Sequence, residues 1–263
     1  MSRADQPARD QTLAPSPRRD RWSTIERDLR RSVGPLIAGI DEVGRGPLAG
    51  PVVACAIIMP PEERVIRGVD DSKVLSAADR AHLAEKIRSR ALSIGVGAAS
   101  VREIDRLNIF HASVLAMRRA LRRLTMQPDH IILDGRAIRT LGVPHTAVID
   151  GDACCYSIAC ASIIAKVTRD RVMHALAIRY PVYRWERNVG YSTAAHFAGI
   201  AEHGVTRHHR QSFLPCRQLT LSFDAPADAP LTTTAEHDLS CLTTESGGSD
   251  LARPSPSPIA DNI

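Results

Sequence analysis

Three short apolar runs in the chain end in acidic side chains. The acids are Asp41 and Glu42 after residues 36–40, Asp134 after residues 131–133, and Asp150 and Asp152 after residues 147–149. Ile, Val, Leu and Ala dominate these runs, which is typical of buried strands. In open α/β sheets the strand ends hold side chains around a crevice, so neighbouring strands would bring several carboxylates together.

Carboxylates that converge in this way repel one another, and some of them take up protons. A divalent cation removes that cost, and a set of oxygen ligands favours Mg²⁺ or Mn²⁺. Two such ions, ~4 Å apart, activate a water molecule and stabilise the leaving oxygen of a phosphodiester. The pattern therefore predicts a two-ion hydrolytic site.

A purely structural role is the alternative for each acid. Asp134 is followed by glycine, and Asp-Gly is also typical of a plain hairpin turn. Asp41 and Glu42 are adjacent, so they point to opposite faces of a regular strand. Both can reach one metal site only if the backbone twists or bulges there, and Gly39 and Gly44 allow such a bulge.

The elements that would position these acids alternate between strands and helices. Strands are predicted at residues 36–40, 51–59, 92–99, 130–133 and 146–149, and helices from Ser76 to Arg90, from Asn108 to Thr125, from Ser157 to Arg179 and from Ser192 or Thr193 to His203. Strands interleaved with helices in this way indicate an α/β domain.

Charge and composition divide the chain into three segments. Residues 221–263 hold seven acids and one base, so their net charge of −6 leaves +11 on residues 1–220 out of the total of +5. A basic body favours a polyanionic partner such as nucleic acid. We expect residues 1–33 to form a mobile basic arm with a short helix near 24–31, and residues 224–263 a disordered acidic tail. Residues 34–223 are the predicted folded domain.

The sequence predicts neither a membrane segment nor a disulfide framework. Its longest apolar stretch, residues 52–59, is too short to span a bilayer. No charged segment leads into an apolar one at the start of the chain, as in a secretory signal. Six cysteines form no Cys-x-x-Cys pair, so zinc is not indicated either. We expect a soluble, cytoplasmic and monomeric protein.

Several of these residues lie in motifs that resemble those of the ribonuclease HII family. The motifs are IDEVGRGPLAGPVV at residues 40–53, DSKVLS at 71–76, LDG at 133–135, SIACASIIAKVTRDR at 157–171, GYST at 190–193 and HRQSF at 209–213. Together they cover about residues 36–215, and their number and order make the resemblance very specific. The sister family, ribonuclease HIII, carries an extra N-terminal domain, for which residues 1–35 are too few.

The resemblance implies a ribonuclease H-like fold, with a mixed sheet flanked by helices and a C-terminal helical segment. It implies an endonuclease that cleaves RNA in RNA–DNA hybrids and on the 5′ side of single ribonucleotides in duplex DNA. The products would carry 5′-phosphate and 3′-hydroxyl ends. Carried over to this sequence, the metal ligands are Asp41, Glu42, Asp134 and Asp152, which selects Asp152 over Asp150.

The same resemblance implies residues that contact the substrate. The backbone of Gly44-Arg45-Gly46 would hold the 2′-hydroxyl of the ribonucleotide, since glycine lets a backbone approach a sugar closely. Tyr191 would stack on or hydrogen-bond to the ribose at the RNA–DNA junction. Lys73 and Lys166, with Arg45, are either phosphate contacts or solvated surface charges.

Some features depart from the family pattern or extend it. Asp150 stands where the family often has Lys, which adds negative charge near the metal site, and Val74 replaces a frequent second Lys. His208 and His209 are expected to contact phosphate or lie on a solvated face. Residues 218–223, QLTLSF, resemble the short peptide that docks bacterial proteins on the replicative sliding clamp; their alternative is a final packed segment of the domain.

Two other functions compete with a ribonuclease. One is a non-catalytic nucleic-acid-binding module on the same fold, but binding alone favours fewer negative charges in the cleft. The other is a two-metal phosphatase for small molecules, which does not need a strongly basic body.

Overall fold

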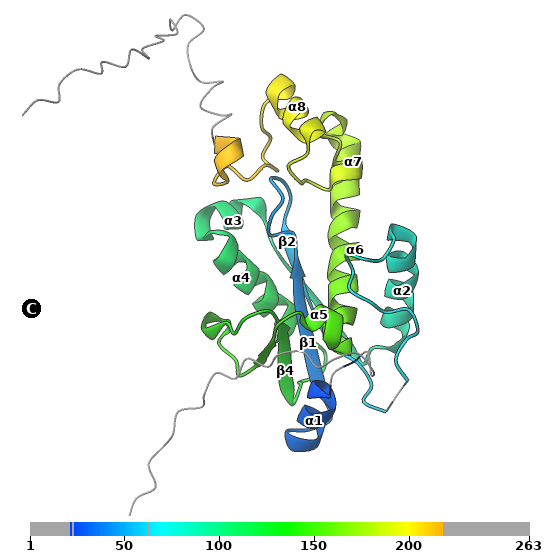
Figure 1. The fold of residues 1–263 in the computed structure, drawn as a ribbon. Coiled ribbons are helices and arrows are strands. Elements are labelled where there is room, and N and C mark those ends of the chain that lie inside the picture. The colour runs from blue at the N-terminus through cyan, green and yellow to red at the C-terminus, as the bar shows by residue number, and fades with distance from the viewer. Residues whose placement is uncertain (1–21, 23, 63, 218–263) are drawn as a thin grey trace, which may run out of the picture. The chain divides into compact units, whose positions relative to one another are not determined.

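The computed structural model describes residues 22, 24–62 and 64–217 (Figure 1). The chain divides into two units, residues 1–225 and 226–263, and every described residue belongs to the first unit. The acidic tail at 224–263, the peptide at 218–223 and residues 1–21 of the arm lie outside the described residues.

The core of the described unit is a mixed five-stranded sheet with the order β3-β2-β1-β4-β5. Its strands are β1 Ile37–Val43, β2 Val52–Ile58, β3 Ser93–Ala99, β4 His130–Asp134 and β5 Thr146–Val148. β1 pairs antiparallel with β2 and parallel with β4, which in turn pairs parallel with β5. All five strands were predicted from the sequence, with ends that differ by a few residues.

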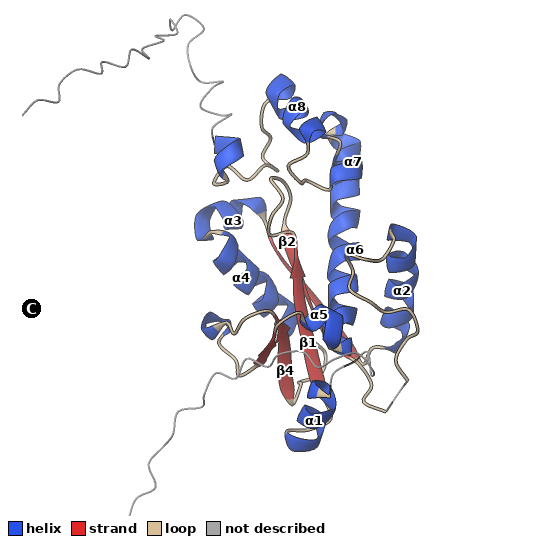
Figure 2. Cartoon of the chain, viewed as in Figure 1, coloured by secondary structure: helices blue, strands red, loops and turns tan. Residues whose placement is uncertain are grey.

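Helices cover both faces of the sheet, as Figure 2 shows. Successive residues of β2 alternate between the two faces. Ala54 and Ala56 pack with α4 (Ile109–Arg122), whereas Cys55 and Ile57 pack with α6 (Tyr156–Arg179) and α2 (Ala77–Arg90). This mixed sheet between two helical layers confirms the ribonuclease H-like architecture.

Local signals explain where several helices begin. The side chains of Ser76, Asn108 and Thr193 each accept a hydrogen bond from a backbone N–H of the first turn, as N-caps do. The remaining elements are α3 Val101–Leu107, α5 Gly151–Cys154, α7 Trp185–Asn188, α8 Ala194–His203 and two short 3-10 turns at Arg139–Leu141 and Pro181–Tyr183.

The N-terminal helix α1, Ile25–Ser32, packs on the folded body rather than lying in a mobile arm. Ile25 and Leu29 contact the apolar cluster formed by β1, β4 and α6. Glu26 is buried, and its Oε1 accepts hydrogen bonds from the backbone N–H (2.8 Å) and hydroxyl (3.0 Å) of Ser157 at the start of α6. The expected helix near residues 24–31 is therefore present, and it packs against the sheet and α6.

The expected C-terminal helical segment follows α6. Trp185 and Tyr183 are buried there with Ile200 of α8 and with Leu48 and Ala49 of the loop between β1 and β2. In the part of the chain that the structure describes, no helix is long and apolar enough to cross a membrane.

Candidate active site

The four acids predicted as metal ligands come from three elements that meet at one end of β1 and β4. Asp41 and Glu42 lie in β1, and Asp134 is the last residue of β4, its parallel neighbour. Oδ1 of Asp134 accepts a hydrogen bond from the backbone N–H of Gly151 at 2.7 Å. This bond fixes the start of α5, which carries the buried Asp152, against the end of β4.

The carboxylates lie within one another's electrostatic field. Burial raises the pKa of Asp41 well above its usual value, and the charges of Glu42 and Asp134 raise it further. Burial, followed by the charge of Asp152, raises the pKa of Asp134 to about 6. Such shifts are expected where like charges share a partly desolvated site. The repulsion makes the cluster a natural acceptor for a cation.

β1 has no bulge at Asp41, because it pairs with β2 without interruption. Glu42 nevertheless lies near enough that its charge adds to burial in raising the pKa of Asp41 and Asp134. Asp41 lies opposite Cys55 and Glu42 lies opposite Ala54, so the two acids keep the alternation of a regular strand. Across the described residues, no three acidic, His or Cys side chains gather closely enough to hold a metal ion as they stand. Gly39 has another role: a Cβ there would lie 2.4 Å from the backbone of Ser157 in α6.

Two basic side chains form ion pairs with carboxylates of the cluster. Nζ of Lys73 lies 2.9 Å from Oδ2 of Asp152, and a guanidinium nitrogen of Arg45 lies 3.1 Å from Oε1 of Glu42. Both bases are exposed, so these pairs are weak and can exchange for other ions. Lys73 and Arg45, expected to contact phosphate, thus lie directly at the acidic cluster.

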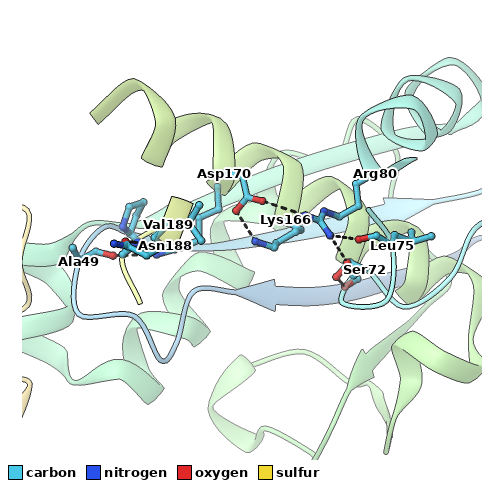
Figure 3. A network of polar contacts seen from close by, with 12 residues as sticks. Ala49, Ser72, Leu75, Arg80, Lys166, Asp170, Asn188 and Val189 are labelled. Carbon is cyan, nitrogen blue, oxygen red and sulfur yellow. Dashed lines mark hydrogen bonds and ion pairs between the residues drawn. The ribbon is translucent and has the colours of Figure 1, made fainter. Parts of the chain in front are cut away.

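Lys166 does not contact the acidic cluster. Its Nζ lies 2.7 Å from Asp170 one turn later in α6, and Asp170 also lies 3.9 Å from the guanidinium of Arg80 (Figure 3). Arg80 donates hydrogen bonds to the carbonyls of Ser72 (2.9 Å) and Leu75 (2.5 Å). Lys166 therefore belongs to a network that holds the loop carrying Lys73 against α6.

Tyr191 flanks the glycine loop, as a shared role would require. Tyr191 is 44% exposed, and a Cβ on Gly46 would lie 3.8 Å from the Cε1 atom of its ring. The backbone N–H of Leu48 donates to the carbonyl of Gly190 at 2.8 Å, which joins the two loops directly. The structure therefore brings Gly44-Arg45-Gly46 and Tyr191 to one surface.

Two buried arginines, to which no role was given from the sequence, hold these loops. Arg210 donates to the carbonyls of Gly44 (2.6 Å), Arg45 (2.9 Å) and Gly50. Arg169 of α6 donates to the carbonyls of Pro51, Ala49 and Val189 at 2.9–3.0 Å. Gly44 has φ +90°, and a Cβ there would lie 2.2 Å from Nε of Arg169, so the motif requires glycine at this position.

Asp150 and Asp152 have different environments. Asp150 is exposed and adopts a left-handed conformation with φ 53°, which turns the chain into α5. Asp152 is 5% exposed and pairs with Lys73. Of the two, Asp152 is the acid whose charge acts on Asp41 and Asp134. Val74 is 69% exposed, so nothing packs on the position where the family often has Lys.

Comparison of the chain with known proteins shows the family to which it belongs. The family model described as Ribonuclease HII matches residues 38–216. This chain belongs to the ribonuclease HII family. The ribonuclease HII of Granulibacter bethesdensis is 54% identical over 206 residues, which cover 76% of this chain and 94% of that protein. The chain is therefore a ribonuclease H, an endonuclease.

Solved structures of the ribonuclease HII family show the same fold. The ribonuclease H2 of Pyrococcus horikoshii matches with a TM-score of 0.62 and 26% identity, covering 72% of this chain and 98% of that one. The ribonuclease HII of Archaeoglobus fulgidus, solved as a complex with PCNA, matches with a TM-score of 0.56 and 25% identity, covering 68% of this chain and 95% of that one.

A buried histidine pair fixes the backbone of Tyr191 in this ribonuclease. Nδ1 of His209 accepts from the N–H of Thr206 (2.9 Å), so its proton lies on Nε2, which donates to Nε2 of His196 (3.1 Å). His196 therefore carries its proton on Nδ1 and donates to the carbonyl of Tyr191 (2.8 Å), while Trp185 also donates to its Nε2. The prediction that His209 lies on a solvated face is wrong, because this residue is only 1% exposed.

We expect Asp134→Asn to stabilise the chelator-treated ribonuclease at pH 8, and the gain to shrink as the pH falls through 6. The pKa of Asp134 is about 6 in the folded protein and 3.8 in the unfolded one. The ionised carboxylate therefore destabilises the fold fully above pH 6, and this cost is lost as the pH falls from 6 toward 3.8. The full shift corresponds to about 3 kcal/mol, and partial exposure of Asp134 reduces it.

Urea unfolding of both proteins in chelator between pH 5 and 8 measures this difference. Burial lowers the pKa of His196 and His209, so these residues destabilise the fold at low pH and not at high pH. Both proteins contain them, so their effect cancels in the difference between the two unfolding free energies. A difference in unfolding free energy that is constant with pH, or that favours the wild type at pH 8, would contradict the prediction.

Proposed function

We propose that this ribonuclease cleaves the RNA strand of RNA–DNA hybrids and cuts on the 5′ side of single ribonucleotides in duplex DNA. Cleavage leaves 5′-phosphate and 3′-hydroxyl ends and uses two divalent cations. The observation that carries this proposal is the position of Tyr191 against Gly46, beside strand-end carboxylates. An enzyme that selects ribonucleotides needs groups that recognise the 2′-hydroxyl next to the groups that hydrolyse the phosphodiester.

Asp41, Glu42, Asp134 and Asp152 are the residues that would hold the cations. Their donor atoms are all oxygens, and burial together with mutual repulsion raises the pKa values of Asp41 and Asp134, a cost that a cation relieves. These properties fit Mg²⁺ or Mn²⁺. When bound, such ions lower the pKa of water and neutralise charge on the phosphate.

Lys73 and Arg45 are accessible counter-charges to two acids of the cluster. Each pairs with one acid, Asp152 or Glu42, and each is exposed. With these carboxylates holding cations, Lys73 and Arg45 would be free to contact the phosphate backbone of a nucleic acid. An ammonium or guanidinium there attracts the nucleic-acid backbone and makes binding dependent on salt.

The glycine loop and Tyr191 select the ribonucleotide. A backbone held rigidly by Arg210 and Arg169 presents its own polar groups to a 2′-hydroxyl without reorganisation. Tyr191 offers an aromatic face and a phenol at the same surface. The 2′-hydroxyl is the group that separates RNA from DNA at a junction.

Nicking of a labelled DNA duplex that holds one ribonucleotide tests the proposed function. We expect a cut 5′ of the ribonucleotide with Mg²⁺ or Mn²⁺, and none with chelator or with an all-DNA duplex. A folded protein that binds this duplex but cuts neither it nor a long hybrid would instead favour the non-catalytic module. Preferential hydrolysis of small phosphate esters would favour the phosphatase.

Tyr191→Ala is expected to reduce cleavage at a single ribonucleotide by about 5- to 150-fold, since an aromatic side chain that stacks on a base contributes about 1–3 kcal/mol. Tyr191→Phe keeps the ring and separates stacking from the phenol hydrogen bond. Divalent-ion binding, followed by the shift in Tm, should be unchanged in both variants. Equal losses of cleavage and ion binding in Tyr191→Ala would refute a substrate-reading role.

We also propose that residues 218–223 dock on a sliding clamp. Support comes from the QLTLSF sequence and from the Archaeoglobus fulgidus relative, which was solved in complex with PCNA. A purified bacterial clamp should retain the wild-type protein in a pull-down and lose the variant Leu221→Ala/Phe223→Ala. Undiminished retention of that variant would remove the proposal.

A further inference from the structure

A basic cavity of about 420 Å³ lies beside the loop that carries Tyr191. It is lined by Arg184, Arg187, Asn188, Thr193 and Ala195, from α7 and the start of α8. The lining holds two guanidinium groups and a hydroxyl and contains no acid. Such a set of donors matches the oxygens of a phosphate group.

Neither arginine of this cavity is engaged elsewhere. Within residues 22, 24–62 and 64–217, the side chains of Arg184 and Arg187 form no ion pair or hydrogen bond, and both are exposed. By contrast, Arg45, Arg80 and Arg119 each pair with an acid. The guanidinium groups of the cavity are therefore available to a ligand from solution.

The backbone at Arg184 is held in an unusual conformation. Its φ of 57° places a non-glycine residue in the left-handed region, which costs about 1–2 kcal/mol. The carbonyl of Arg184 accepts hydrogen bonds from the N–H groups of Arg187 (3.0 Å) and Asn188 (3.1 Å), which keep this turn in place. Strain retained by surrounding bonds is a common property of binding sites.

The cavity and Tyr191 belong to one rigid loop. Asn188 is buried, and its carbonyl accepts from the N–H of Tyr191 (2.8 Å) while its Oδ1 accepts from Gly190 (2.9 Å). The N–H of Thr193 donates to the carbonyl of Tyr191 at 2.9 Å. A ligand in the cavity is thus held at a fixed offset from the residue proposed to read the ribose.

We infer that this cavity binds a backbone phosphate of the substrate duplex, away from the scissile bond. The inference rests on the proposed function and extends it by a second, sequence-independent contact. A phosphate of the same duplex suits the site because the duplex already lies at Tyr191 and continues beyond it. Two arginines on one phosphate fix the register of the duplex but read no base.

The test is a pair of charge-matched double variants. Arg184→Gln/Arg187→Gln removes the cavity's charges, and Arg64→Gln/Arg67→Gln removes two exposed arginines at the same spacing in the loop between β2 and α2. In chelator, the Kd for a duplex with one ribonucleotide is measured over a series of salt concentrations. The proposal predicts about a tenfold weaker Kd for the cavity variant and a slope of log Kd against log salt lower by about 0.9.

The control variant should keep the wild-type slope, and the cavity variant should keep kcat and the cleavage position while KM rises. Equal changes in both variants would indicate a general loss of charge and overturn the inference. A wild-type Kd and slope in the cavity variant would overturn it as well. Failure of the wild type to nick the duplex would instead refute the proposed function.

Duplex length locates the phosphate. Each arm of the duplex is shortened in turn, and we expect removal of one arm to weaken binding by the wild type and the control variant but not by the cavity variant. Such non-additivity identifies a contact shared by the arm and the cavity. If every shortened arm weakens the cavity variant as much as the wild type, no phosphate binds there.

Discussion

Asp134→Asn is expected to reduce ribonuclease activity by about 10²–10⁴-fold, because it removes a carboxylate from the proposed cation site. Metal ions supply several kcal/mol of charge stabilisation in phosphodiester hydrolysis, and each 1.36 kcal/mol is a factor of ten in rate. The substituted amide can still accept the hydrogen bond from Gly151 that fixes α5. The loss should therefore come from chemistry and not from unfolding.

The measurement compares single-turnover nicking by Asp134→Asn, Asp150→Asn and the wild type. Asp150→Asn is the matched control, because it removes the same charge from an exposed turn two residues before Asp152. We expect its rate to stay within about tenfold of the wild type. The addition of Mg²⁺ or Mn²⁺ should raise the Tm of the wild type more than that of Asp134→Asn. A folded and fully active Asp134→Asn protein would disprove the ligand assignment.

Arg210→Met should combine a large loss of stability with a large loss of cleavage. Arg210 is fully buried and donates to the carbonyls of Gly44, Arg45 and Gly50. Removal of the guanidinium leaves these carbonyls without donors in the interior, at a cost of about 2–4 kcal/mol in unfolding free energy. The glycine loop loses its fixed shape, so we also expect at least tenfold slower cleavage.

Arg217→Met is the control for Arg210→Met, since Arg217 is exposed near the end of the described residues. Cleavage is compared at a temperature where both variants are fully folded, on a duplex with one ribonucleotide and on a long hybrid. Loss of the loop's shape should slow cleavage at the single ribonucleotide more than cleavage of the long hybrid, because the single site offers the loop only one 2′-hydroxyl. Normal cleavage by folded Arg210→Met would show that the loop does not need this anchor.

Burial, followed by the nearby charge of Arg169, lowers the pKa of Arg210 to about 9. At neutral pH both arginines remain charged, so two cations lie beneath the glycine loop with backbone carbonyls as partners. Their positive potential extends toward the surface that Tyr191 shares with Gly46. The two arginines therefore stabilise the loop and also favour the approach of a polyanion.

The sequence by itself determined the elements and the acids at their ends. Short apolar runs interleaved with helical patterns predicted all five strands, because the preference of Val, Ile and other apolar residues for buried strands acts locally. Ser76, and Ser192 or Thr193, predicted helix starts for an equally local reason, since an N-cap bonds to its own first turn. The structure selects Thr193 for the second of these helices. The motifs around Asp41 and Asp134 then identified the family that the comparisons show.

Only the tertiary structure decided how distant residues serve the site. Arg210 bonds to Gly50 across 160 positions of sequence, and a buried Arg with carbonyl partners leaves no local pattern. His209 was expected at the surface because it stands between basic residues, yet Thr206 and His196 satisfy both ring nitrogens in the core. Partners of this kind depend on how loops fold back on one another, and spacing along the chain does not encode them.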